Sequence, residues 1–193
     1  MPMWIAEAEL AARAAAGDPE AKGALLALIR PGIVRYCRAR LGRTTGGYDL
    51  ADDVAQEVCL AVLAALPRFR DQGRPFSAFA FGIAAHKIAD AQRVAVRSAS
   101  VTTAESLPDR PDPAPGPEQR AESADLARRL SILLENLSDH HRELIVLRVA
   151  VGMSADEVGE VLGMTAAAVR VAQSRALARL RNLAGNLFDE VAA

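Results

Sequence analysis

Residues 154–180 read SADEVGEVLGMTAAAVRVAQSRALARL, and this stretch decides the fold of the C-terminal part of the chain. Ser154 can cap a short helix, because Glu157 follows three residues later and the two can bond reciprocally as a capping box. Gly163 ends that helix, since glycine readily adopts the left-handed conformation found after a helix C-terminus. Thr165 can cap the next helix, which is longer and basic. A short helix, a glycine-containing turn and a basic helix are typical of a helix-turn-helix.

The second helix of this motif separates its apolar and polar side chains. At about 100° per residue, one side carries Val169, Ala172, Ala176 and Leu180. The other sides carry Arg170, Ser174, Arg175, Arg179 and Arg181. Such a helix would enter the major groove of DNA with its N-terminus first and contact base edges and phosphates. An alanine-rich helix with solvated arginines is the alternative.

A proline-rich segment divides the rest of the chain. Residues 98–122 contain five prolines among Ser, Thr, Asp and Glu, a composition that cannot hold a helix and predicts an extended linker. Two small domains are therefore expected, at 1–97 and 123–193, which the total of 193 residues allows. High alanine content and only 4% aromatic residues favour an all-α fold.

Apolar periodicity and helix start and stop signals place the expected helices. In the first domain they span 4–16, 19–42 with a kink at Pro31, 49–66 and 75–97. In the second domain they span 123–136, 139–151, 154–162 and 165–187.

The formal net charge is −1, which argues against a nucleic-acid-binding protein only if the charges are evenly spread. They are not: residues 1–97 carry 13 basic and 10 acidic groups, and residues 98–124 carry 2 and 5. Residues 125–193 carry 8 and 9. Five arginines and no acid occupy 30–43, whereas four acids and no base occupy 49–57. Lys22 and Lys87 are the only lysines, and arginine is the better residue for bidentate contacts.

The acidic charges lie on one side of the expected helix 49–66. Its apolar side consists of Leu50, Val54, Val58, Cys59, Val62 and Leu66. The opposite side gathers Asp49, Asp52, Asp53, Gln56 and Glu57 around Leu60. One interpretation is a solvated face with an incidental exposed leucine. The other is a docking surface for a basic partner, with carboxylates around an apolar centre.

Residues 68–81, RFRDQGRPFSAFAF, interleave three arginines with Phe69, Phe76, Phe79 and Phe81. This pattern suits single-stranded nucleic acid, where phosphates pair with arginine and unstacked bases need apolar platforms. The alternative, which we favour for most of these rings, is packing in the core. Residues 70–75 are expected to be a loop, and a loop on a rigid helical frame can form a pocket for one flipped base.

Cysteine usage and the lack of targeting signals indicate a cytoplasmic protein. Cys37 and Cys59 are too few for a disulfide framework and are expected to be small buried hydrophobes. The N-terminus carries Glu7 and Glu9 before any apolar run, unlike a signal peptide, and no stretch approaches the roughly 18 apolar residues of a membrane span.

No pattern in the chain predicts an enzyme. There is no P-loop, no metal-ligand spacing and no nucleophile with a plausible base. His140 and His141 are adjacent on a helix and cannot share one metal face. We therefore expect no cofactor, no metal and no small-molecule substrate.

Three stretches of the chain resemble an extracytoplasmic-function sigma factor of bacterial RNA polymerase, of the sigma-70 family. They are DDVAQEV (52–58), LPRFR (66–70) and, across the linker, LSDHHRELIVLRVAVGMSADEVGEVLGMTAAAVR (137–170). The resemblance covers nearly the whole chain apart from the linker and the extreme termini. The strings DDVAQEVCLA, GRPF, GIAAHK and AVRVAQ are most similar to the actinobacterial sigma-D type. The resemblance implies sigma region 2 at 1–97 and sigma region 4 at 123–193.

The resemblance also implies site residues. The acidic helix would bind the β′ clamp helices of core polymerase through Asp49, Asp52, Asp53, Gln56, Glu57 and Leu60. The loop 69–75 would capture a flipped base of the −10 element and helix 76–97 would hold melted DNA, with contacts at Phe69, Arg70, Asp71, Gln72, Gly73, Arg74, Phe79, His86, Lys87 and Arg93. The helix 165–180 would read the −35 duplex through Thr165, Ala167, Arg170, Val171, Gln173, Ser174, Arg175 and Arg179.

Three positions depart from the family pattern. Phe79-Ala80 stands where Trp-Leu is common, and His86 stands where Asn is common. Val171-Ala172 replaces a common Ser-Arg pair, which removes one expected phosphate or base contact. The −35 sequence of other members therefore cannot be copied to this chain.

The expected function is promoter recognition for RNA polymerase, with the core enzyme (β′ clamp helices and β flap) and promoter DNA as partners. The resemblance also implies an anti-sigma factor, which in this family is often membrane-tethered. One rival is a stand-alone helix-turn-helix regulator with an N-terminal sensing or dimerisation domain, which residues 49–70 disfavour. The other is a helical scaffold that binds only protein.

Overall fold

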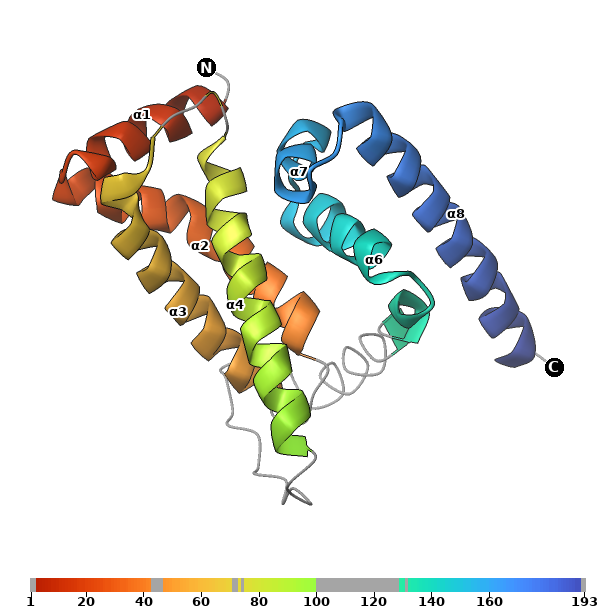
Figure 1. The fold of residues 1–193 in the computed structure, drawn as a ribbon. Coiled ribbons are helices and arrows are strands. Elements are labelled where there is room, and N and C mark those ends of the chain that lie inside the picture. The colour runs from red at the N-terminus through yellow and green to blue at the C-terminus, as the bar shows by residue number, and fades with distance from the viewer. Residues whose placement is uncertain are drawn as a thin grey trace, which may run out of the picture.

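The computed structural model describes residues 3–42, 47–70, 73, 75–99, 129–130 and 132–191. Within these ranges the chain forms helices and no strand, which confirms the all-α prediction. Figure 1 shows two groups of helices, α1 to α4 and α6 to α8, on opposite sides of the molecule. The predicted linker and most of the predicted helix 123–136 lie outside the described residues.

The first group comprises α1 (Met3–Ala15), α2 (Pro19–Leu41), α3 (Gly47–Ala65), the short 3₁₀ helix η1 (Leu66–Arg68) and α4 (Phe76–Ala99). Asp18 caps α2, because its carboxylate accepts the backbone N–H groups of Glu20 and Ala21. Helix α2 continues through Pro31 to Leu41, and α3 begins two residues before the expected start at Asp49.

The core of the first group forms where α2 packs on α1, α3 and α4. Ile33, Cys37 and Val58 are fully buried. The ring of Tyr36 on α2 meets Phe81 of α4 edge to face, with centroids 5.6 Å apart. This packing orients α3 so that its polar side faces outward.

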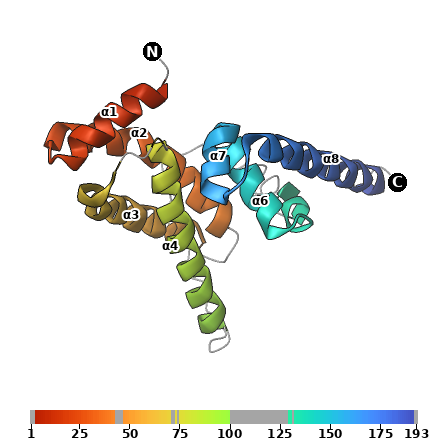
Figure 2. The same cartoon turned by 45° about the horizontal axis from the view of Figure 1, so that its top comes forward.

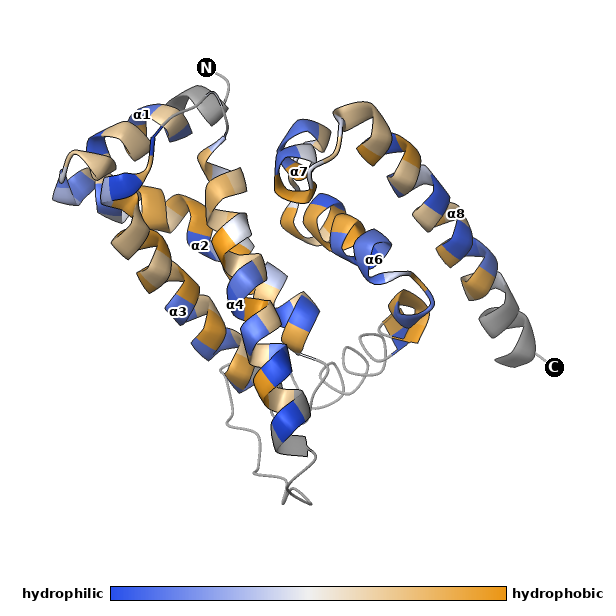
Figure 3. Cartoon of the chain, viewed as in Figure 1, coloured by the Kyte–Doolittle hydropathy of each residue, from blue (hydrophilic) through white to orange (hydrophobic). Residues whose placement is uncertain are grey.

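The second group comprises α6 (Asp139–Ile145), η2 (Val146–Val151), α7 (Ala155–Leu162) and α8 (Ala166–Val191). The sequence predicted one helix over 139–151, but from Val146 onward the turns widen into a π-helix. The segment ends at Gly152, which has a left-handed φ of 88°. Figure 3 shows hydrophilic residues recurring among hydrophobic ones along α8, as expected for an amphipathic helix.

Local signals shape the turn between α7 and α8 as predicted. The capping box is present: Ser154 N–H donates to Glu157 Oε2 at 2.7 Å, and Glu157 N–H donates to Ser154 Oγ at 3.2 Å. Gly163 ends α7 with a φ of 67°. The chain then passes so close to Gly159 that a Cβ there would lie 2.5 Å from the carbonyl oxygen of Met164.

We expect Gly159→Ala to destabilise the second domain by about 2 kcal/mol, because the added methyl group meets backbone that cannot move without opening the turn. Denaturant unfolding followed by circular dichroism measures this change. Gly185→Ala is the matched control, since a Cβ at that helical glycine meets nothing within 4 Å and should stabilise α8 by roughly 0.5–1 kcal/mol. Equal effects of the two substitutions would contradict the close approach at Gly159.

The two groups pack directly against each other. Helix α2 contacts η2, and α4 contacts α7. The view in Figure 2, turned from that of Figure 1, shows the same arrangement, with α7 beside α4 and α8 extending away from the first group. The outer sides of α3 and α8 therefore remain clear of this contact.

Candidate docking and nucleic-acid interfaces

The acidic side of α3 faces solvent, as the helical periodicity predicted. Asp49, Asp52, Asp53, Gln56 and Glu57 are all exposed, and Leu60 among them is 61% exposed. The opposite side is buried at Val54, Val58 and Val62. A large exposed leucine within a ring of carboxylates is the arrangement expected of a docking surface with an apolar centre and a polar rim.

Two of these carboxylates already have basic partners from other helices. Asp52 accepts two hydrogen bonds from Arg38 of α2, from Nε at 2.8 Å and from Nη2 at 2.7 Å. These bonds hold the pKa of Asp52 below its ordinary value. Glu57 pairs with Lys87 of α4 at 3.1 Å. Among the described residues, Asp53 makes no ion pair, so its charge is available to a partner.

A groove of about 460 Å³ runs between α2 and α3 beside these carboxylates. The α2 side contributes Arg30, Val34 and Arg38, and the α3 side contributes Asp52, Asp53, Ala55, Gln56 and Cys59. The surface is therefore acidic on α3 and basic on α2. Sequence reasoning found both charge clusters but could not place them on facing sides of one groove.

The two cysteines are apolar rather than reactive groups in this structure. Cys37 is fully buried, as predicted, and burial raises the pKa of its thiol to about 12. Cys59 is half-buried at the groove, and burial raises its pKa as well. Neither thiol is an effective nucleophile at neutral pH, because the thiolate is the reactive species.

Three phenylalanine rings that flank the predicted −10 loop in sequence meet in one cluster. Phe69 lies 5.1 Å from Phe76 and 5.2 Å from Phe79 between ring centroids. Phe76 and Phe81 are buried, which confirms the core interpretation for these two rings, whereas Phe69 and Phe79 are half-buried. The cluster joins the segment before the loop to the start of α4.

The loop itself is described only in part. Arg70 is exposed, and its Nη1 donates to the carbonyl oxygens of Pro67 and Phe69 at 3.2 and 3.1 Å. Gly73 has a φ of +77°, which favours glycine. Asp71, Gln72 and Arg74 lie outside the described residues.

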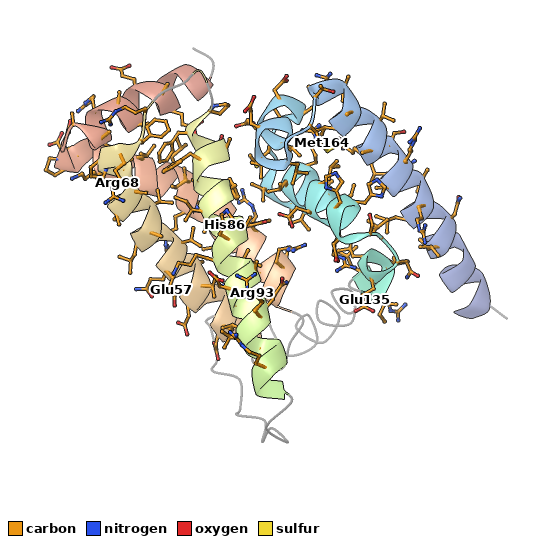
Figure 4. All side chains as sticks on the ribbon, in the orientation of Figure 1. Glu57, Arg68, His86, Arg93, Glu135 and Met164 are labelled. Carbon is orange, nitrogen blue, oxygen red and sulfur yellow. The ribbon has the colours of Figure 1, made fainter. Side chains whose placement is uncertain are left out.

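The predicted −10 contacts on α4 form a stripe along the helix. Phe79, His86 and Arg93 recur every seven residues and therefore share one side. His86 and Arg93 are exposed, and both are labelled on α4 in Figure 4. Arg93 pairs with Asp90 one turn earlier, and Lys87 pairs with Glu57 of α3. The stripe begins at the aromatic cluster and continues toward the other end of α4.

Glu7, which sequence reasoning did not select, holds the N-terminal end of α4. Its Oε1 accepts the backbone N–H of Ser77 at 2.6 Å, although 70 residues separate the two. The Ser77 hydroxyl donates to Glu157 Oε1 of α7 at 2.8 Å. Burial raises the pKa of Glu7; the Ser77 N–H opposes this shift, and the nearby Glu157 carboxylate adds to it.

The raised pKa of Glu7 predicts that stability falls as the pH rises. The folded state holds the Glu7 proton more tightly than the unfolded state, so the stabilisation is fully present below the ordinary pKa of the group. It is lost as the pH rises through the folded pKa. Glu7→Gln keeps a carbonyl acceptor for Ser77 and should flatten this dependence in urea unfolding between about pH 4 and pH 8. The exposed Glu9→Gln is the control, and equal pH slopes in all three proteins would reject the expectation.

The predicted DNA-reading helix presents the predicted residues outward, with one exception. Val169, Ala172 and Ala176 are buried. The exposed residues of the predicted −35 set are Thr165, Ala167, Arg170, Val171, Ser174, Arg175 and Arg179. Thr165 also accepts the N–H of Ala168 at 3.2 Å, and Arg170 lies 3.9 Å from Asp156 of α7.

The exception is Gln173, which is half-buried and turned toward η2. Its Oε1 accepts from Arg148 Nε at 2.9 Å, and Arg148 also donates to the carbonyl oxygen of Met153. An arginine can only donate, so the amide oxygen of Gln173 must face it and the NH₂ group faces away. The NH₂ group of Gln173 is therefore the part of its amide that faces away from Arg148 and can donate to DNA.

None of the helices described is long and apolar enough to cross a membrane. Within the same part of the chain, no three His, Cys, Asp or Glu side chains gather as metal ligands would.

Comparisons with known proteins agree on one family. The family described as Sigma-70 region 2 matches residues 25–98, and Sigma-70 region 4 matches residues 133–182. The chain is 54% identical to the ECF RNA polymerase sigma factor ShbA of Streptomyces griseus over 175 residues, covering 89% of this chain and 92% of ShbA. It is 54% identical to the ECF RNA polymerase sigma factor SigD of Mycobacterium tuberculosis over 171 residues, covering 89% and 80% of the two chains.

A solved structure has the same arrangement of helices. It contains CnrH in complex with the cytosolic domain of CnrY, and CnrH matches this chain with a TM-score of 0.68 and 31% identity. The match covers 94% of this chain and 98% of that one. In sequence, CnrH of Cupriavidus metallidurans is 36% identical over 181 residues.

Proposed function

This chain belongs to the extracytoplasmic-function group of the sigma-70 family of RNA polymerase sigma factors, and we propose that each of its two domains carries a different part of promoter recognition. Residues 1–97 bind core polymerase and the −10 element, residues 98–122 are the linker, and residues 123–193 bind the −35 element. The exposed acidic side of α3 around Leu60 is the observation that carries this assignment. It matches the position where the family docks on polymerase.

The first domain docks through α3 on the β′ clamp helices. Asp53 and Glu57 supply charge to a basic partner, and Leu60 supplies the apolar centre. The aromatic cluster of Phe69 and Phe79 supports the loop that accepts a flipped −10 base. His86 and Arg93 on α4 then follow the melted strand, where cations and stacking groups suit phosphates and bases.

The second domain binds the −35 duplex through α8 and contacts the β flap of core polymerase. The exposed residues Arg170, Val171, Ser174 and Arg175 occupy the N-terminal half of α8, which is the part that enters the major groove in helix-turn-helix proteins. The exposed Val171 can contact apolar groups such as the thymine methyl, whereas Ala172 beside it is buried.

The chain acts by coupled binding, without a catalytic group or a small-molecule substrate of its own. Its place of action is the cytoplasm, where polymerase and promoter DNA meet. An anti-sigma factor is the third proposed partner, as the resemblance to the family implies; the related CnrH was solved in complex with another protein, the cytosolic domain of CnrY. By resemblance to the family, that partner is often membrane-tethered.

The decisive experiment mixes the purified chain with core polymerase and a pool of promoter fragments. We expect the chain to co-purify with core polymerase and to direct transcription from a subset of the pool, and sequencing of the transcripts gives the promoter consensus. A stand-alone regulator would instead bind duplex DNA tightly without polymerase. A protein-binding scaffold would show no salt-dependent DNA affinity at all.

A further inference from the structure

Arg148 of η2 contacts two other parts of the second domain at once. Its Nε donates to Oε1 of Gln173 on α8 at 2.9 Å, and its Nη1 donates to the carbonyl oxygen of Met153, just before α7. The Arg148 side chain is half-buried. Because a guanidinium is planar and holds its donors in a fixed arrangement, this one side chain ties the π-helix to α8 and to the segment that leads into α7.

The backbone around Arg148 is itself held in place. The Leu147 carbonyl oxygen accepts the N–H groups of both Gly152 and Met153, the second at 3.0 Å. Met153 is 4% exposed, and its carbonyl oxygen faces Arg148. A π-helix is rare and occurs frequently at functional sites. The start of the Arg148 side chain is therefore fixed relative to α8 by bonded backbone.

Gln173 lies at the border between the packed and the exposed sides of α8. Ala172 and Ala176 are buried, whereas Arg170 and Ser174 are exposed. Gln173 follows Arg170 by three residues, and side chains at this spacing are neighbours on a helix surface. The Gln173 amide is therefore beside the residues that the proposed function places against DNA.

The bond from Arg148 decides which hydrogen-bonding groups this amide can offer. A free glutamine presents an oxygen and an NH₂ group together, and with both it pairs bidentately with adenine N6 and N7. The Arg148 guanidinium can only donate, so it holds the amide oxygen of Gln173 and leaves the two N–H donors. Acceptors for such donors are guanine O6 and N7, thymine O4, adenine N7 and the phosphate oxygens.

We propose that Arg148 is a positioning residue for −35 recognition, which holds the Gln173 amide so that its NH₂ group donates to an acceptor on the −35 duplex. The acceptor is a base-edge atom or a phosphate oxygen, and position 173 does not read adenine bidentately. This inference rests on the proposed function, in which α8 enters the −35 major groove. It adds a residue outside α8 to those that determine promoter choice.

The test measures binding of the polymerase holoenzyme to a promoter library in which the −35 region is randomised, with sequencing of the bound fragments. Gln173→Met removes both donors without changing the charge. If the acceptor is a base edge, the preference at one base pair should fall by about fivefold. If the acceptor is a phosphate, affinity should fall by about fivefold for all sequences alike. No change of either kind would overturn the proposal.

Two substitutions at Arg148 test its positioning role. Arg148→Lys keeps a group that can only donate, so it should retain the selection of the unchanged chain. Arg148→Met has no donor, so it should show the loss seen with Gln173→Met in addition to the general effect of one lost charge. In a chain that already carries Gln173→Met, only the charge effect should remain. Equal losses in the two backgrounds would contradict action through Gln173.

Arg142→Met separates positioning from a merely structural role. Arg142 of α6 is also half-buried and donates to the carbonyl oxygens of Leu134, Glu135 and Leu137, so its loss should lower thermal stability. It should leave the base preferences of the holoenzyme unaltered. If Arg142→Met and Arg148→Met changed the selected sequences alike, the positioning role would be rejected.

Gln173→Glu keeps the proposal testable if Arg148→Met loses helical structure by circular dichroism. The carboxylate still accepts from Arg148, so the melting temperature should not fall. It offers DNA no donor and adds a negative charge, so holoenzyme affinity should fall below that of Gln173→Met. Asn136→Asp makes the same charge change at an exposed position of the second domain and should leave affinity unaltered. Full affinity of Gln173→Glu would refute the proposal.

Failure of this inference can be told apart from failure of the proposed function. If the holoenzyme with the unchanged chain selected no −35 sequence from the library, the proposed function would be overturned and the inference with it. If the unchanged chain selected a −35 sequence and every folded variant of Arg148 and Gln173 selected it equally well, only the inference would be overturned.

Discussion

Reversing two charges on α3, as Asp53→Lys with Glu57→Lys, should abolish capture of the chain by core polymerase in a pull-down. Both side chains are exposed on the side of α3 that surrounds Leu60. Like charges brought together across an interface cost several kcal/mol, and every 1.4 kcal/mol is about tenfold in affinity, so we expect a loss on the order of 100-fold.

The pairing on this surface determines the controls. Glu57→Lys also faces Lys87, its present partner, so part of its effect would arise within the chain. Asp53→Lys alone avoids this, because Asp53 makes no ion pair among the described residues, and it should weaken binding by about tenfold. Glu9→Lys with Glu20→Lys reverses the same number of charges on α1 and α2. Retained affinity of the α3 double variant would remove the docking assignment.

Arg170→Ala should weaken binding of the polymerase holoenzyme to promoter fragments that contain the −35 element. Arg170 is exposed near the start of α8, and its 3.9 Å approach to Asp156 is too long to hold it firmly away from DNA. A lost base contact costs about 1–3 kcal/mol, which is roughly 5- to 150-fold in affinity. A lost phosphate contact lowers the slope of log affinity against log salt by about one.

Measuring affinity at several salt concentrations distinguishes the two kinds of contact. Arg30→Ala removes an exposed arginine from α2, at the groove beside α3, and should leave the −35 footprint and the salt slope as they are. An unchanged footprint together with an unchanged slope in Arg170→Ala would reject the assignment of α8 as the reading helix.

Much of the candidate site could be predicted because its signals are local. The capping box of Ser154 and Glu157, the left-handed Gly163 and the outward side of α3 all follow from spacings of a few residues. The widening of the predicted helix 139–151 into a π-helix could not be found this way. Its apolar pattern there suits an α-helix as well as the observed turns.

Sequence reasoning could not show which of the site residues are free to contact a partner. In the sequence, Asp52 and Glu57 look equivalent to Asp53. In the structure, Asp52 pairs with Arg38 and Glu57 pairs with Lys87. The sequence also predicts Gln173 as a DNA contact, and in the structure its side chain accepts a hydrogen bond from Arg148. Each of these partners comes from another helix, and helix periodicity shows which side of a helix is polar without showing what lies opposite.

By itself, the sequence determined the all-α class, the helix-turn-helix and the sidedness of α3 and α8, because caps, turns and periodicity act over a few residues. Only the tertiary structure decided which charges are paired and how the domains meet. Glu143 shows the difference: its partners Tyr36 and Arg40 lie more than 100 residues earlier in the chain. Contacts at that separation depend on how whole helices pack, and no local pattern encodes them.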